Sequence, residues 1–158
     1  MAEQKTNVMR LIDAAKLPYK AHCYLGSGAV SGMEIVQALG ENPDRTFKTL
    51  VTVGRSGQHY VFVVPVNREL DLKKAAAVAK EKSIEMIKSK DLLKTTGYIH
   101  GGCSPIGMKK LFPTAVHESA LSFDTILFSA GKIGFQVEMS VQDLQKMIPL
   151  TLADLVVS

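Results

Sequence analysis

The chain has 158 residues, of which 46% are hydrophobic and 22% charged, and its 19 lysines and arginines against 15 acids give a net charge of +4. This length predicts one globular domain over residues 1–158 that buries about 70% of the surface of its unfolded chain. The apolar content excludes a disordered chain, and no apolar run approaches the roughly 20 residues that span a bilayer. The N-terminal residues lack the apolar region of a signal peptide, so we expect a cytoplasmic protein without a membrane partner.

The first half of the chain alternates helical and extended patterns. Val8 to Ala15 has apolar residues at helical spacing before Pro18, and Ser31 stands three residues before Glu34, the spacing of a capping box. The loop at 26–32 is rich in small residues and can line a pocket. The predicted elements are a helix over 8–15, a strand over 19–24, a helix from Ser31 to Gly40, and strands over 46–53 and 60–66 joined by a turn at 55–58.

The second half predicts shorter elements around a glycine-rich loop. They are a helix over 72–79 capped by Asp71, a strand over 84–87, a helix over 91–94 ending at Gly97, strands over 115–118, 125–128 and 135–139, a helix over 141–147 capped by Ser140, and a strand over 152–157. Strands outnumber helices and their order is mixed. We therefore expect an α+β fold with a mixed, barrel-like β-sheet and flanking helices.

The basic residues are unevenly distributed along the chain. Residues 68–94 hold eight of the 19 lysines and arginines against five acids, whereas residues 117–158 are net acidic. A solvated lysine-rich helix face explains this pattern, and so does a surface that faces phosphate groups. The lysines at 109–110 allow the same two interpretations.

Cysteines and histidines give no sign of a metal site. Cys23 and Cys103 lie far apart, outside any CxxC pair, and the four histidines have no HExxH or His-x-His spacing. Two unpaired thiols are typical of a reducing compartment. We expect no metal and no other cofactor.

The loop at 101–107 has three glycines and a proline in seven residues. Glycines let backbone N–H groups approach a ligand and bind an anion or a developing oxyanion. The loop matches neither GxxxxGK[ST] nor GxGxxG, which argues against a nucleotide-phosphate loop. A purely structural turn is the alternative.

Lys48 lies inside an extended run, where alternation places it on one face with Leu50 and Thr52. Such a lysine can protect an edge strand from aggregation. Alternatively, it is a cation held in a pocket, where it could polarise an ester carbonyl or hold a phosphate, and where desolvation would lower its pKa.

No sequence motif identifies a catalytic nucleophile. Ser104 and Ser129 sit in glycine-containing turns without the GxSxG elbow of serine hydrolases. Cys103 is close in sequence to His100, which leaves a thiol hydrolase open as one hypothesis.

Three segments together are similar to a known family. They are residues 47–49 (Phe-Lys-Thr), residues 96–110 with the glycine-rich loop, and residues 129–132 (Ser-Ala-Gly-Lys). As an ordered set they resemble the YbaK/EbsC family, the stand-alone relatives of the editing domain of bacterial prolyl-tRNA synthetase. The resemblance runs from about residue 5 to the end.

The resemblance implies an aminoacyl-tRNA deacylase that removes cysteine mischarged onto tRNA(Pro). The substrate's own thiol would attack its ester carbonyl, and the cysteinyl group would leave the tRNA as a thiolactone, so that no protein nucleophile is needed. The implied partners are the acceptor end of an aminoacylated tRNA and a docked prolyl-tRNA synthetase. By position, Lys48 would be the essential pocket lysine, and the substrate would be bound by Tyr24, Thr49, Gly101, Gly102, Ser104 and Ser129.

The chain departs from the family pattern at three positions. Cys103 replaces a residue that is usually aliphatic, Ile133 a common arginine, and Gln136 an acidic residue of some members. Cys103 is then better interpreted as a small apolar loop residue. The altered wall beyond Ser129 leaves hydrolysis of alanyl-tRNA(Pro) by water, and a non-catalytic module that binds a nucleic-acid 3′ end or a metabolite, as alternatives.

Overall fold

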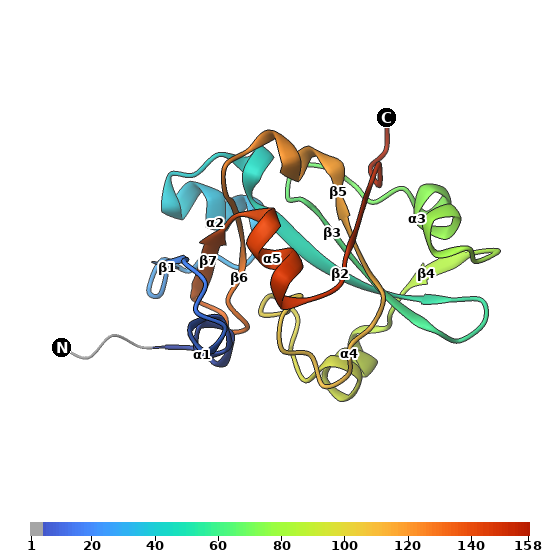
Figure 1. Ribbon diagram of the computed structural model, residues 1–158, viewed down its shortest axis with the longest axis horizontal. Coiled ribbons are helices and arrows are strands. Elements are labelled where there is room, and N and C mark those ends of the chain that lie inside the picture. Colours follow the sequence, from blue (N-terminus) through green and yellow to red (C-terminus); the bar gives the residue numbers. More distant parts are fainter. Residues whose placement is uncertain (1–4) are drawn as a thin grey trace.

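The computed structural model describes residues 5–158. Its helices are α1 (Asn7–Ala14), α2 (Gly32–Leu39), α3 (Leu72–Ala79), α4 (Ser89–Thr96) and α5 (Val141–Met147), with short 3-10 turns at Pro43–Arg45 and Glu118–Ser122. Its strands are β1 (Lys20–Cys23), β2 (Phe47–Gly54), β3 (His59–Pro65), β4 (Ile84–Met86), β5 (Thr114–His117), β6 (Ile126–Ser129), β7 (Phe135–Met139) and β8 (Thr151–Ala153). Figure 1 shows the helices around the strands.

The strands form two sheets. One is antiparallel with the order β1-β7-β6, and the other has the order β4-β2-β3-β5-β8, with parallel pairing between β3, β5 and β8. An isolated bridge between Thr46 and Leu127 joins the start of β2 to β6. The predicted α+β fold with a mixed sheet is confirmed, although the sheets do not close into a barrel within residues 5–158.

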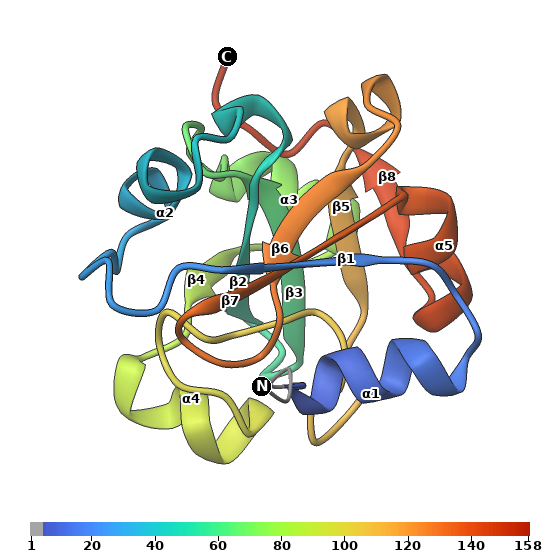
Figure 2. The ribbon, with the colours of Figure 1, turned by 90° about the vertical axis from the view of Figure 1, so that its left-hand side faces the viewer.

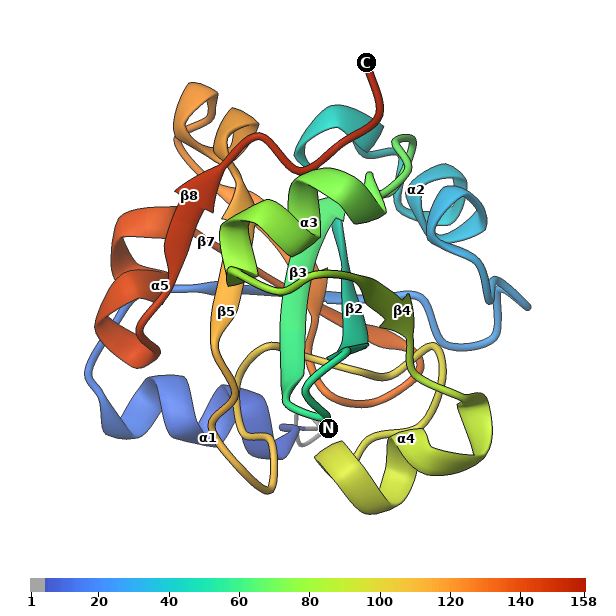
Figure 3. The ribbon, with the colours of Figure 1, turned by 90° about the vertical axis from the view of Figure 1, so that its right-hand side faces the viewer.

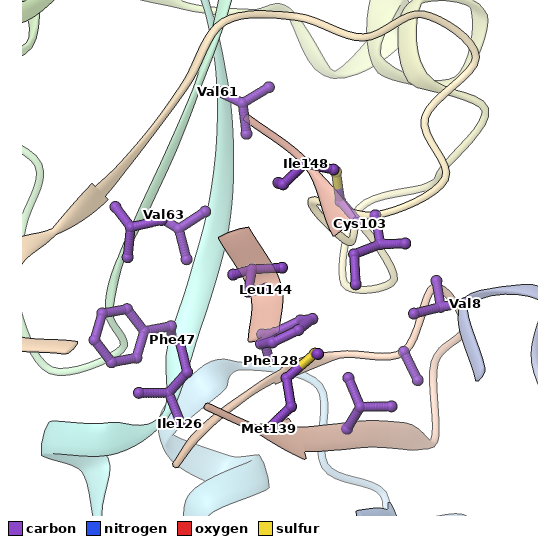
Figure 4. Close-up of a cluster of buried hydrophobic side chains, with 14 of the residues drawn as sticks. Val8, Phe47, Val61, Val63, Cys103, Ile126, Phe128, Met139, Leu144 and Ile148 are labelled. Carbon is purple, nitrogen blue, oxygen red and sulfur yellow. The ribbon is translucent and has the colours of Figure 1, made fainter. Parts of the chain in front are cut away.

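Two apolar clusters hold the sheets and helices together. The larger cluster fills the space between the two sheets, α1 and α5, and includes Phe47, Val63, Phe128 and Met139 (Figure 4). The smaller one lies under α3, which crosses one face of the five-stranded sheet (Figure 3). Because α3 presents the small side chains of Ala75 and Ala76 to this sheet, it can pack closely against it.

The predicted helix caps are present. Ser31 and Glu34 form both bonds of a capping box, Asp71 accepts from two backbone N–H groups at the start of α3, and Ser140 caps α5. Each cap fixes where a helix begins, and α2 thereby starts beside the cavity described below.

Two elements have a boundary that differs by more than one residue from the sequence prediction. Helix α4 begins at Ser89 without a side-chain cap, so the sequence offered no signal there, and Asp91 lies inside the helix, paired with Lys94. Strand β8 stops at Ala153 because Asp154 turns the chain, accepting from the N–H of Val156. The predicted strand over 152–157 was therefore too long.

Within residues 5–158, no helix has both the length and the apolar character to cross a membrane.

Candidate active site

A cavity of about 480 Å³ opens along one edge of β2. The other edge of β2 pairs with β3. On this edge β6 approaches only at Thr46, β4 pairs only with 52–54, and the N–H of Ile87 donates to the Val51 carbonyl. Residues 46–51 line the cavity, and 47–50 have no partner strand on this edge among the described residues. The volume lies within the range of about 300 to 1,000 Å³ that is usual for small-molecule sites.

The remaining walls come from Val66 after β3 and from four other parts of the chain. The start of α2 and the segment from β4 to α4 flank the cavity on two sides, and Figure 2 shows these helices above and below β2. The glycine-rich loop contributes residues 100, 101 and 103, and the smaller sheet contributes Ser129 and Gln136. The site thus lies at the junction of the two sheets.

Four of the residues named from the sequence line this cavity. They are Lys48 and Thr49 on β2, Gly101 in the loop, and Ser129 at the end of β6. The small-residue loop before α2 also reaches the cavity, through Val30, Ser31 and Gly32.

The other three named residues are not part of the cavity lining. Tyr24 is buried after β1, and its hydroxyl has no hydrogen-bond partner within residues 5–158. The Gly102 N–H donates to the carbonyl of Ile99, and the Ser104 hydroxyl accepts from the N–H of Ile106. The polar groups of Gly102 and Ser104 therefore stabilise the shape of the loop, which presents Gly101 to the cavity.

Lys48 is a half-buried cation without a direct partner. No hydrogen bond or ion pair to its ammonium is found within residues 5–158, and burial lowers its pKa, opposed in part by the more distant charge of Glu69. Strand β2 is an interior strand of its sheet, but its edge beside Lys48 has no partner strand in the described part of the chain, so protection of this edge by Lys48 stays a prediction beside the pocket interpretation. The ammonium is free to bind an anion or a carbonyl oxygen.

Two buried polar atoms of the cavity walls also lack partners. The Thr49 hydroxyl and the Gln136 side-chain carbonyl make no hydrogen bond within residues 5–158. Leaving such a group unpaired costs about 1 to 3 kcal/mol. A structure tolerates this cost where a ligand supplies the missing bonds.

The glycine-rich loop is held by Tyr98. Its hydroxyl donates to the carbonyl of Ile106, and a side chain at Gly107 or Gly131 would collide with its ring or hydroxyl. Burial raises the pKa of Tyr98 to about 12, so it remains a neutral donor. Tyr98 thus packs between the glycine-rich loop and the turn at Gly131. Gly101 takes a positive φ of 87° that favours glycine.

Cys103 is a residue of the apolar core and lacks the properties of a nucleophile. Its side chain packs in the larger cluster (Figure 4), and burial raises its pKa to about 12 despite a hydrogen bond with Thr96. A thiol with this pKa is not a thiolate at neutral pH. The Cys103 and His100 hypothesis therefore lacks an activated nucleophile.

His22, Glu41 and Glu138 place ligand atoms within 4.8 Å of one another beside the smaller sheet. Arg45 donates to both carboxylates, and His22 lies 2.8 Å from Glu138. Burial alone would raise the pKa of Glu138, but the hydrogen bonds from Thr125, His22 and Arg45 lower it to about 2. The group is an ion-pair network in which Arg45 already supplies the positive charge.

Residues 27–147 match the family model of the aminoacyl-tRNA editing domain. The chain belongs to this family. A relative from Enterococcus faecalis, EbsC, whose name proposes a Cys-tRNA(Pro)/Cys-tRNA(Cys) deacylase, is 49% identical over 139 residues, which are 87% of this chain and 85% of that protein. A proline–tRNA ligase from Thermosipho melanesiensis is 35% identical over 79 residues, which are 49% of this chain and 14% of the ligase.

Solved structures show the same fold as this editing domain. The hypothetical protein APE2540 has a TM-score of 0.87 at 21% identity, with 95% of this chain and 99% of that chain covered. A structure described as a candidate trans-editing enzyme for prolyl-tRNA synthetase has a TM-score of 0.83 at 22% identity, with 98% and 100% covered. The family resemblance found in the sequence is confirmed.

Sequence reasoning did not name Gln136 as a substrate-binding residue. Gln136 was noted as a departure from the family pattern that alters the wall beyond Ser129, and in the structure it is 4% exposed and lines the cavity. The residue directly opposite Gln136 on β6 is Ser129, and this pairing is not readable from one sequence. The available signal was the alternation in 135–139, which places Gln136 on one face of the strand with Glu138.

Proposed function

We propose that this editing domain is a trans-editing deacylase that removes cysteine from mischarged tRNA(Pro). The observation that carries the proposal is Lys48, a half-buried cation without a partner, in a cavity whose Thr49 and Gln136 also lack partners. The name of the Enterococcus faecalis relative supports cysteine as the amino acid. The protein would act in the cytoplasm as one domain.

The chemistry assigns the nucleophile to the substrate. The cysteinyl thiol would lose its proton, its sulfur would form a bond to the ester carbonyl carbon, and the bond from that carbon to the ribose oxygen would break. The ribose oxygen takes up a proton, and a cyclic thiolactone leaves. Cys103, with its raised pKa of about 12, does not compete for this role.

In this reaction the chain contributes position and electrostatics. The Lys48 ammonium would stabilise the oxyanion or hold a phosphate of the terminal nucleotide, and the Thr49 hydroxyl would bind the ester end of the substrate. Gly101 brings backbone close to the same space. Tyr24, Gly102 and Ser104 would act on the substrate only indirectly, by holding the walls.

The acceptor end of tRNA would approach over α4. Ser89 and Leu92 of this helix line the cavity, and the lysines at 88, 90 and 94 surround them. The lysines at 73, 74 and 80 belong to α3 or its end and lie over the other sheet face (Figure 3). The position of the first group beside the cavity supports a contact with phosphates near the site. A docked prolyl-tRNA synthetase would supply the recognition of more distant tRNA features.

The test is deacylation of tRNA(Pro) charged separately with cysteine, alanine and proline. We expect release from the cysteinyl substrate alone, with thiolactone as the first product. Free cysteine as the first product would refute the thiol attack, and faster release of alanine would favour the alanyl hydrolase. No release from any substrate would favour a binding module.

A further inference from the structure

Gln136 and Ser129 form a pair of polar groups in the wall of the cavity. They lie directly opposite each other on β7 and β6, so their side chains project from the same face of the smaller sheet. Both are buried, with exposed fractions of 4% and 9%, and both line the cavity. These two residues are therefore placed to contact one ligand group together.

Both side chains can hydrogen-bond a ligand. The Gln136 carbonyl has no donor within residues 5–158, so it is a free acceptor, and the amide nitrogen of the same side chain carries two N–H donors. The Ser129 hydroxyl oxygen accepts from the N–H of Gly131 at 3.1 Å, which leaves its hydrogen free to be donated. The pair thus offers the Gln136 carbonyl as an acceptor, and donors from both residues, to a ligand.

The charges of the cavity lining are positive. Lys48 lines the cavity, and no aspartate or glutamate of the described residues does so. Glu138 is two residues along β7 on the same face as Gln136, but its oxygens are already bound by His22, Arg45 and Thr125. A cationic ligand group would therefore enter beside Lys48 with no free carboxylate to balance it.

We propose that Gln136 and Ser129 bind the α-amino group of the aminoacyl ester in its neutral form, an inference that rests on the deacylase function. A neutral amine has N–H groups for the Gln136 carbonyl and a lone pair for the Ser129 hydroxyl. An ammonium has no lone pair, and its charge would be repelled by Lys48. Gln136 is thus a specificity-determining residue that selects the charge state of the substrate.

The experiment compares two esters of tRNA(Pro), cysteinyl and 3-mercaptopropionyl, which differ only in the α-amino group. The ratio of their kcat/KM values removes any titration that both substrates share. The groups of the protein that face Gln136 are Lys48, His100 and Cys103 in the cavity, and the network of His22, Glu138, Arg45 and Glu41 beside it. Their charges affect both esters.

In the wild-type protein, the cysteinyl to mercaptopropionyl ratio should rise about ten-fold or more from pH 5.5 to 8, because an α-amino group loses its proton near pH 7 to 8. Gln136→Glu should raise the ratio at pH 5.5 and flatten or reverse this slope, because a carboxylate prefers the ammonium. Gln136→Met, which keeps the volume but has no acceptor, should lower the ratio at every pH. Gln145→Glu, on the exposed side of α5, is the matched charge control.

A Gln136→Glu profile that superimposes on the wild-type profile would overturn the proposal. A Gln136→Glu protein whose ratio at pH 5.5 is no higher than that of the wild-type protein would also overturn it, since the different thiol pKa values of the two esters cancel when the two proteins are compared. If wild-type protein deacylates neither ester, the deacylase function itself has failed and the proposal falls with it. Thermal unfolding of each variant separates a folding defect from a change in specificity.

Discussion

Replacing Lys48 by methionine should abolish most of the activity without destabilising the protein. Methionine keeps the apolar stem of the side chain and removes only the ammonium, so that packing against β2 and β3 is retained. An electrostatic group aimed at a developing oxyanion contributes about 3 to 4 kcal/mol, which corresponds to a loss of roughly 10² to 10³ in kcat. Single-turnover deacylation of cysteinyl-tRNA(Pro) measures this loss.

The same substitution should leave the free energy of unfolding unchanged or increase it. Burial lowers the pKa of Lys48, so the folded protein binds this proton less tightly than the unfolded chain does. The charged lysine therefore costs stability at neutral pH, and the wild-type protein gains stability as the pH rises from the lowered pKa of Lys48 to its unfolded value. Lys48→Met should lack this gain in urea unfolding at alkaline pH.

Two results would refute this reasoning. A Lys48→Met protein with kcat within about three-fold of wild type would show that the ammonium does not serve the reaction. A large fall in the free energy of unfolding of Lys48→Met at neutral pH would show that the ammonium stabilises the fold through a partner not seen in the structure. Lys73→Met, on the exposed side of α3, is the control for loss of one positive charge.

Three further outcomes follow from other parts of the structure. Cys103→Ala should keep its deacylation rate, because the thiol is buried and neutral, and its free energy of unfolding should fall by about 1 to 2 kcal/mol in thermal unfolding. A loss of turnover without a loss of stability would instead support the thiol hydrolase. Glu138→Gln should lower the free energy of unfolding by about 2 kcal/mol near neutral pH in urea unfolding. The difference from wild type should vanish as the pH falls from about 4 to 2, because the wild-type carboxylate takes up its proton in this range. An equal difference at pH 2 would show that the charge of Glu138 is not the cause. Lys90→Ala should reduce the slope of log affinity for tRNA against log salt by about 0.7 to 0.9, with Lys73→Ala as a control that leaves it unchanged.

Local signals in the sequence predicted much of the fold. The caps at Ser31, Asp71 and Ser140 depend on residues within four positions of one another, and a single sequence contains all of that information. The alternation around Lys48 similarly indicated a polar side chain held on a strand. Its position in a pocket came from the family resemblance and agrees with the cavity lining.

Long-range pairing explains what could not be predicted. Gln136 becomes a wall residue because β7 pairs with β6 and β1, and Ser104 is turned away because Tyr98 fixes the path of its loop. The division into two sheets depends on which strands meet across long separations in sequence. Periodicity within a segment does not contain this information. The prediction of one domain over residues 1–158 stays a prediction.

The gap between β4 and β6 along β2 also has a dynamic consequence. A stretch of strand with one unpaired edge is held by fewer hydrogen bonds than a strand with a partner on each side. Local opening of this stretch of β2 therefore needs less free energy than local opening of β3. Amide hydrogens of residues 47–50 should then exchange with solvent faster than those of residues 61–63, which pair with a strand on each side. A bound acyl-adenosine end would act as a temporary neighbour of this edge and slow that exchange.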